Sequence, residues 1–222
     1  MYDKFIEIYS IFWYQVIILM FLVYGMLFSF AFYYKKGFMS AKVSRTSAHI
    51  LMGITLVFLS EHTFAIIVFS IGMINGTHHL LTKPKYLEDV LNKKSSWGVW
   101  IYSYTLAILT IIALPQGNFL AFQLAMIVLS ISDPIAMIVG SKFPIKSAGK
   151  YNKSIGGSLA FLISAIISMV IILYLHQILN TTSITLIILL AFMGMIVEFI
   201  SVKGTDNATI PFVIYIPALF LF

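Results

Sequence analysis

The chain has 222 residues, of which 60% are hydrophobic and only 10% are charged, and its mean hydropathy is +0.99. Soluble domains carry about 25% charged residues, so this composition excludes a soluble protein and indicates a polytopic membrane protein. The chain contains no cysteine, which excludes disulfides and thiolate metal sites. The net charge of +6 is best interpreted by position, because basic residues of membrane proteins mark the cytoplasmic loops.

Eight apolar segments predict membrane spans, and together they predict an all-α, polytopic transmembrane helix bundle that forms a single domain over residues 1–222. About 20 apolar residues are needed to cross the hydrocarbon layer. The segment 47–77 is too long for one crossing and carries Glu61 and His62 at its centre, so we expect two short spans with a turn at 60–63. The other predicted spans are 11–34, 97–114 (before the turn signal at 115–118), 119–140, 156–178, 184–200 and the shorter 209–222.

The distribution of basic residues sets the predicted orientation. With eight spans, 13 of the 14 lysines and arginines fall in loops on one side, which are 35–46, 78–96, 141–155 and 201–208. Such loops lie in the cytoplasm. The sequence therefore predicts a multi-pass integral membrane protein with both termini outside.

The polar residues of the spans gather at the predicted cytoplasmic boundary. Asp133 lies seven residues before Gly140, where its span ends, which is about 10 Å along an α-helix. A carboxylate inside the membrane is costly, so it indicates function. The other members of this group are Arg45, His49, His78, His79, Glu198, Asp206 and Asn207.

This group suits the transfer of a phosphoryl group beside a lipid. Lysines and a glycine-bearing turn can hold phosphates, and one or two carboxylates can hold Mg²⁺ through oxygen ligands. Phosphoryl transfer needs little beyond a positioned metal, cations and an aligned nucleophile. The sequence has no GxxxxGK[ST] and no HExxH, which excludes the phosphate-binding loop of soluble NTPases and the zinc-protease motif.

The acidic candidates each have a functional and a plainer interpretation. Asp133 would be a metal ligand or the base that orients a lipid hydroxyl; the alternative is an ion pair with a nearby lysine. Asp206 and Asn207 would complete the metal or nucleotide site, or would cap the following helix. Glu198 would be a metal ligand or the ion-pair partner of Lys203.

Among the cations, Lys153 is the one we expect to contact phosphate, because it adjoins Ser154 and two glycines. The segment 156–158 opens a span, and a helix N-terminus offers free N–H groups to an anion; its alternative role is close helix packing through small residues. Arg45 is the second cationic candidate. The lysines that satisfy the positive-inside rule without any ligand are Lys142, Lys146 and Lys150.

The histidines are weaker candidates. His49 is expected to hydrogen-bond within the bundle, which is the common fate of a lone histidine. His78 and His79 suggest a metal, but adjacent residues on a helix point about 100° apart. We therefore expect them to be interface residues.

Two linked motifs resemble the signature of the polyprenol kinase family, which comprises dolichol, phytol and farnesol kinases and the CTP-dependent diacylglycerol kinases. They are Asp133-Pro134-Ile-Ala136-x3-Gly140 and Lys153-Ser154-x-Gly156-Gly157-Ser158. Three further segments are similar to family elements, and they are Arg45-x3-His49, Trp97-Gly98, and Glu198 with Gly204-Thr-Asp206-Asn207-Ala-Thr-Ile-Pro211. The matches run in order from residue 45 to 211.

The resemblance implies a kinase that phosphorylates a membrane lipid alcohol, either an isoprenoid alcohol or diacylglycerol, with CTP as the usual donor and Mg²⁺ as the metal. Asp133 and Lys153 would be catalytic, and His49 an accessory residue. The implied metal ligands are Asp133, Glu198 and Asp206. The implied nucleotide contacts are Arg45, Gly140, Lys153, Ser154, Gly156, Gly157 and Asn207. The expected partners are the lipid alcohol, the nucleotide and membrane lipids, without nucleic acid.

Two alternatives stay open. Phosphatidate cytidylyltransferases share the Asp-x-x-Ala-x3-Gly core, but they usually carry tyrosine at the position of Met137 and a histidine-rich C-terminal block, whereas no histidine follows His176. A small ion or lipid transporter would line the whole membrane depth with polar residues. The chain also departs from the kinase pattern at Thr46, where lysine is common, and at Pro144, where glycine is common.

Overall fold

The computed structural model describes residues 17, 21, 25–26, 28–30, 32–58, 96–117, 119–143, 145, 153–202 and 204–222. Its helices are α2 (Ala41–Phe58), α5 (Ser96–Gln116), α6 (Phe119–Ile127), η1 (Val128–Ser132, a π-helical turn), α7 (Asp133–Lys142), α8 (Ile155–Leu175), α9 (Thr181–Ile200) and α10 (Asp206–Leu221). No strand occurs in this part of the chain, which confirms the all-α prediction.

Three helices are long and apolar enough to cross a membrane: Phe119–Lys142, Ile155–Leu175 and Thr181–Ile200. They correspond to the spans predicted at 119–140, 156–178 and 184–200. Two shorter apolar helices, Ile101–Ala113 and Asp206–Leu221, accompany them. The total of eight spans and the outside position of both termini remain predictions, and the turn at 60–63 and His78–His79 lie outside the described residues.

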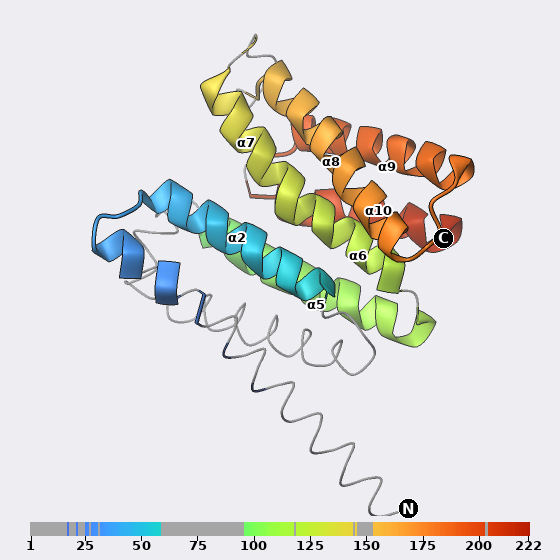
Figure 1. The fold of residues 1–222 in the computed structure, drawn as a ribbon, viewed down its shortest axis with the longest axis horizontal. Helices are drawn as coiled ribbons and strands as arrows, with labels where there is room; N and C mark the ends of the chain where they lie inside the picture. Colours follow the sequence, from blue (N-terminus) through green and yellow to red (C-terminus); the bar gives the residue numbers. More distant parts are fainter. Residues whose placement is uncertain are drawn as a thin grey trace, which may run out of the picture.

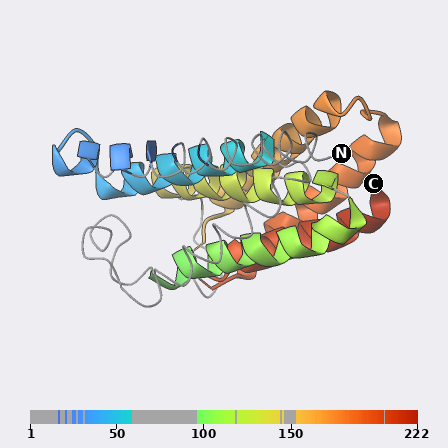
Figure 2. The ribbon, with the colours of Figure 1, turned by 90° about the horizontal axis from the view of Figure 1, so that it is seen from below.

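The helices form two layers. In Figure 1, α6, η1 and α7 make one long helix, with α8 along one side and α2 along the other. The view in Figure 2 shows α5 and α10 side by side below α2 and this long helix. α9 packs against both α8 and α10. One end of the bundle holds the starts of α2, α5, α8 and α10 (Figures 1 and 2). The same end holds the last residues of α7 and α9.

α6 is the centre of the core. Six of its nine residues are buried, and α10, α2, α5 and α8 all pack against it, as expected for a helix that is hydrophobic all round. α8 instead has an outward apolar stripe with four-residue spacing, formed by Leu159, Ile163, Ile167 and Ile171, each about half exposed. Exposing such a stripe of apolar side chains to water is unfavourable, so the stripe suits contact with lipid.

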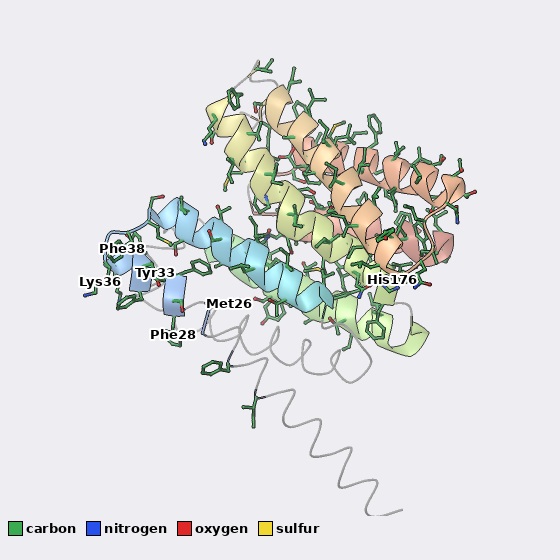
Figure 3. The ribbon with its side chains drawn as sticks, viewed as in Figure 1. Met26, Phe28, Tyr33, Lys36, Phe38 and His176 are labelled. Carbon is green, nitrogen blue, oxygen red and sulfur yellow. The ribbon has the colours of Figure 1, made fainter. Side chains whose placement is uncertain are left out.

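The two ends of the bundle differ in their side chains (Figure 3). Exposed Tyr33 and Phe38 flank Lys36 at the turn before α2, and Lys36 Nζ lies 5.6 Å from the centroid of the Phe32 ring. Aromatic and basic side chains of this kind are typical of a membrane interface. At the far end, His176 Nε2 and Gln123 Oε1 are 2.6 Å apart and tie α8 to α6.

Local sequence explains the helix ends. Gly117 adopts φ +64° between α5 and α6, which glycine does without steric penalty; the turn thus lies within the predicted 115–118, but α5 continues through Pro115 and Gln116. At the start of α9, Asn180 and Ser183 form a capping box, which pairs two backbone N–H groups that would otherwise lack partners.

Candidate functional site

The site is built around a lysine held by two acids. Lys153, which precedes α8, places Nζ 2.5 Å from Glu198 Oε1 on α9 and 3.8 Å from Asp206 Oδ2 on α10. Ser158 Oγ donates to the other Glu198 oxygen at 3.3 Å. Glu198 is only 4% exposed, so its charge needs this lysine. The ion pair joins the start of α8, the end of α9 and the start of α10.

The start of α10 is fixed to α5 by Asn207. Its Nδ2 donates to the carbonyl oxygen of Gly98 at 2.7 Å, across 109 positions of sequence. Gly98 allows this approach, since a Cβ there would lie 3.1 Å from that nitrogen. Asp206 Oδ1 accepts from the backbone N–H groups of Gly204 and Asn207, and Gly204 adopts φ +97°.

Neither Asp206 nor Asn207 occupies the N-cap position of α10, although Asp206 Oδ1 accepts from the first-turn N–H of Asn207. The N-cap position is Thr205, which makes no side-chain cap bond. Asp206 stabilises the turn before the helix and directs its second oxygen to Lys153.

The glycines of the two central motifs bring α7 and α8 into backbone contact. A Cβ on Gly157 would lie 2.9 Å from the Ala136 carbonyl oxygen, and one on Gly156 would lie 2.8 Å from that of Phe143. A Cβ on Gly140 would lie 2.6 Å from Ser154 Oγ. The structure therefore shows close helix packing through small residues, which was the alternative role of the segment 156–158.

The first N–H groups of α8 are mostly occupied. Ser154 is the N-cap, and its Oγ accepts from the Gly157 N–H at 3.1 Å. The Ile155 N–H donates to the Ile145 carbonyl and the Ser158 N–H to the Ser154 carbonyl. In this structure the Ser154 side chain therefore pairs with the N–H group that an anion would otherwise bind at the start of α8. The residue of this motif that could contact a phosphate is Lys153.

Asp133 lies just beyond a distortion of its helix. Pro134 has no N–H, and the preceding turn, Val128–Ser132, is π-helical. His49 Nε2 lies 3.3 Å from the Leu129 carbonyl oxygen within that turn, so His49 hydrogen-bonds within the bundle, as predicted. Since Ala136 is level with Gly157, Asp133 is about one helical turn deeper than the Lys153 cluster.

The structure thus brings together most of the residues that the sequence singled out. The end of the bundle holds Gly98, Gly140, Lys153, Ser154, Gly156, Gly157, Glu198, Asp206 and Asn207. Asp133 and His49 lie deeper. Arg45 belongs to α2, but its side chain, like Lys146, Lys150 and Lys203, lies outside the described residues.

The predicted metal set is not assembled as a set of three. Among the described residues, no three histidine or acidic side chains are grouped so that they could hold a metal ion. The physical reason is that Glu198 and Asp206 both face Lys153, whose positive charge offsets only one of their two negative charges, while Asp133 lies a turn away.

The sequence does not predict one member of the cluster and one pairing. Ser158 appears in the sequence only as part of a motif, yet it donates to Glu198. Glu198 pairs with Lys153 and not with Lys203, the partner that the sequence suggests. A buried acid close to the end of α9 does signal that a basic partner is needed, but it does not say which lysine.

Comparison with known proteins adds no relative, because no family model, no curated protein and no solved structure matches this chain.

Proposed function

We propose that this protein is a CTP-dependent kinase of a membrane lipid alcohol, with its site at the cytoplasmic boundary. One observation carries the proposal: segments separated by up to 109 positions meet at one end of an apolar bundle around Lys153, Glu198, Asp206 and Asn207. A charged cluster beside an apolar surface lies where a water-soluble nucleotide and a lipid can both reach.

The roles follow from exposure and depth. Lys153 is the member of the cluster suited to contact phosphate, because its side chain is 21% exposed while that of Glu198 is 6% exposed. Glu198 holds the lysine in place through the ion pair. Asp133 would orient the lipid hydroxyl, whose oxygen attacks the γ-phosphorus as the bond to the β–γ bridging oxygen breaks. The nucleoside diphosphate leaves, and the hydroxyl proton passes to Asp133.

Mg²⁺ fits this arrangement through fewer protein ligands than the sequence suggested. Nucleotide-bound Mg²⁺ often uses one or two carboxylates together with phosphate oxygens and water. Asp206 is the more exposed acid of the cluster, at 13%, so it is the residue that would hold the ion. The ion would supply positive charge to the phosphates.

Radiolabelled CTP tests the proposal. Purified protein in detergent should transfer label from the γ position, but not from the α position, to a lipid alcohol, and a chelator of divalent cations should abolish transfer. Transfer from the α position alone would instead indicate CDP-lipid synthesis and would overturn the proposal.

Two variants refine this experiment. Asp133→Asn should abolish turnover while the protein remains folded in detergent, and Lys153→Met should reduce turnover strongly. Lys142→Met is the matched control, since Lys142 is exposed at the end of α7. Full activity of Asp133→Asn would contradict its role.

A further inference from the structure

Deeper in the bundle, side chains of α2, α5 and η1 meet in a second polar group. We call it the hydroxyl junction, and it comprises His49, Gly53, Tyr102 and Ser130. The ring centroids of His49 and Tyr102 are 4.9 Å apart. Gly53 packs directly on Ser130, because a Cβ at residue 53 would lie 1.7 Å from Ser130 Oγ. The Tyr102 hydroxyl and the Ser130 side chain lie close enough to interact with each other.

Two hydroxyls of this junction are shielded from solvent and have no hydrogen-bond partner of good geometry beyond their contact with each other. They are the Tyr102 hydroxyl and Ser130 Oγ, and Ser130 is fully buried. Leaving a buried polar group unpaired costs about 1–3 kcal/mol, so each such group in a native structure needs a reason. Thr46 on α2 and Ser132 on η1 also carry buried, unpartnered hydroxyls. These hydroxyls suit a ligand that brings its own donor and acceptor.

The π-helical turn at Val128–Ser132 is a second distinctive feature of the hydroxyl junction. Such turns inside α-helices are often found at functional sites. This turn carries Ser130 and Ser132, and Asp133 follows it directly. Ser130 is therefore about 4.5 Å along the helix from Asp133, on the side away from the Lys153 cluster.

We propose that the hydroxyl junction binds the alcohol group of the lipid substrate, a proposal that rests on the lipid-kinase function above. An alcohol has one donor and two acceptor positions, which can pair with both Tyr102 and Ser130. Bound there, its oxygen lies within a turn of Asp133. His49 and Tyr102 are only partly buried, while the Tyr102 hydroxyl and Ser130 are shielded from solvent, so the junction lies just beneath the surface of the bundle.

Ligand binding without nucleotide tests this site separately from the kinase reaction. The purified full chain in detergent is titrated with a long-chain isoprenoid alcohol and with its methyl ether, and thermal unfolding and affinity are measured. The alcohol should raise the unfolding midpoint more than the ether does. Ser130→Ala and Tyr102→Phe should remove that difference. They should weaken alcohol binding about 3- to 10-fold, the value of one net hydrogen bond, and weaken ether binding less, because an ether oxygen can accept a hydrogen bond but cannot donate one.

A matched control removes a buried hydroxyl elsewhere. Ser168 Oγ donates to the Ala165 carbonyl within α8, and Ser168→Ala should keep the preference for the alcohol. The proposal is overturned if the wild-type protein binds alcohol and ether equally, or if both junction variants keep the preference. Loss of the preference for the alcohol in those variants supports the hydroxyl junction, whether or not label is transferred from CTP. Absence of label transfer would reject only the kinase function.

Discussion

The pair of Lys153 and Glu198 permits a quantitative test by a double-mutant cycle. Lys153→Met removes the charge but keeps much of the side-chain volume. It leaves Glu198, 4% exposed, without its cation, and Asp206 adds a second negative charge within 3.8 Å of the vacated position. Breaking a buried ion pair by removing one partner costs about 3–5 kcal/mol. We expect about 3 kcal/mol, since the Lys153 side chain is 21% exposed and water can replace part of the interaction.

The second arm of the cycle removes both charges. In Lys153→Met with Glu198→Gln, no uncompensated charge remains, and Ser158 can still donate to the amide oxygen at residue 198. Replacing both members of a buried pair is often nearly neutral, so the double variant should lose about 1 kcal/mol. With a loss of zero or more for Glu198→Gln alone, the coupling free energy, which is the sum of the two single losses minus the double loss, should be about 2 kcal/mol or more.

The assay is equilibrium unfolding in mixed micelles of a mild detergent and dodecyl sulfate, followed by tryptophan fluorescence. Lys142→Met serves as the control, because exposed residues usually change stability by less than about 0.5 kcal/mol. A coupling below about 0.5 kcal/mol, or a double variant as unstable as the sum of the single variants, would refute the interpretation that Glu198 depends on Lys153.

Three further predictions concern stability in the same assay. Gly157→Val should cost about 1–3 kcal/mol of stability, because its Cβ would lie 2.9 Å from the Ala136 carbonyl oxygen. Gly25→Ala should be tolerated, since nothing lies within 4 Å of a Cβ there, and equal effects of the two variants would contradict the packing role of Gly157. Asn207→Ala should cost about 1 kcal/mol through loss of the bond to Gly98, and no loss would show that this bond is dispensable. Asn180→Ala should cost about 1 kcal/mol because it breaks the capping box of α9, and an unchanged midpoint would argue against the box.

Much of the fold could be predicted because each helix carries its own signals. Apolar runs of sufficient length and glycine and proline at the turns located α5, α8 and α9 to within a few residues at most ends. The meeting of polar motifs at one end also followed from the sequence, since alternating spans return every second boundary to the same side.

The contacts within the site could not be predicted in the same way. The lysines before α8 satisfy the positive-inside rule equally well, so the sequence did not identify Lys153 as the partner of Glu198. A glycine pair at a helix start has the same sequence signature whether it binds a phosphate or a neighbouring helix; only the backbone approach at Gly157 distinguishes the two. The burial of the Tyr102 and Ser130 hydroxyls depends on contacts between three separate helices.

The π-helical turn at Val128–Ser132 also sets the rotational phase between α6 and α7. A π turn behaves as an α-helix with one residue inserted, and one residue corresponds to about 100° of rotation. Deleting one residue within 128–132 would therefore shorten the helix but keep the buried faces of both halves in place. A deletion at any other position between 119 and 142 would rotate one half by that angle and turn either the α6 core or Asp133 and Gly140 away from their neighbours.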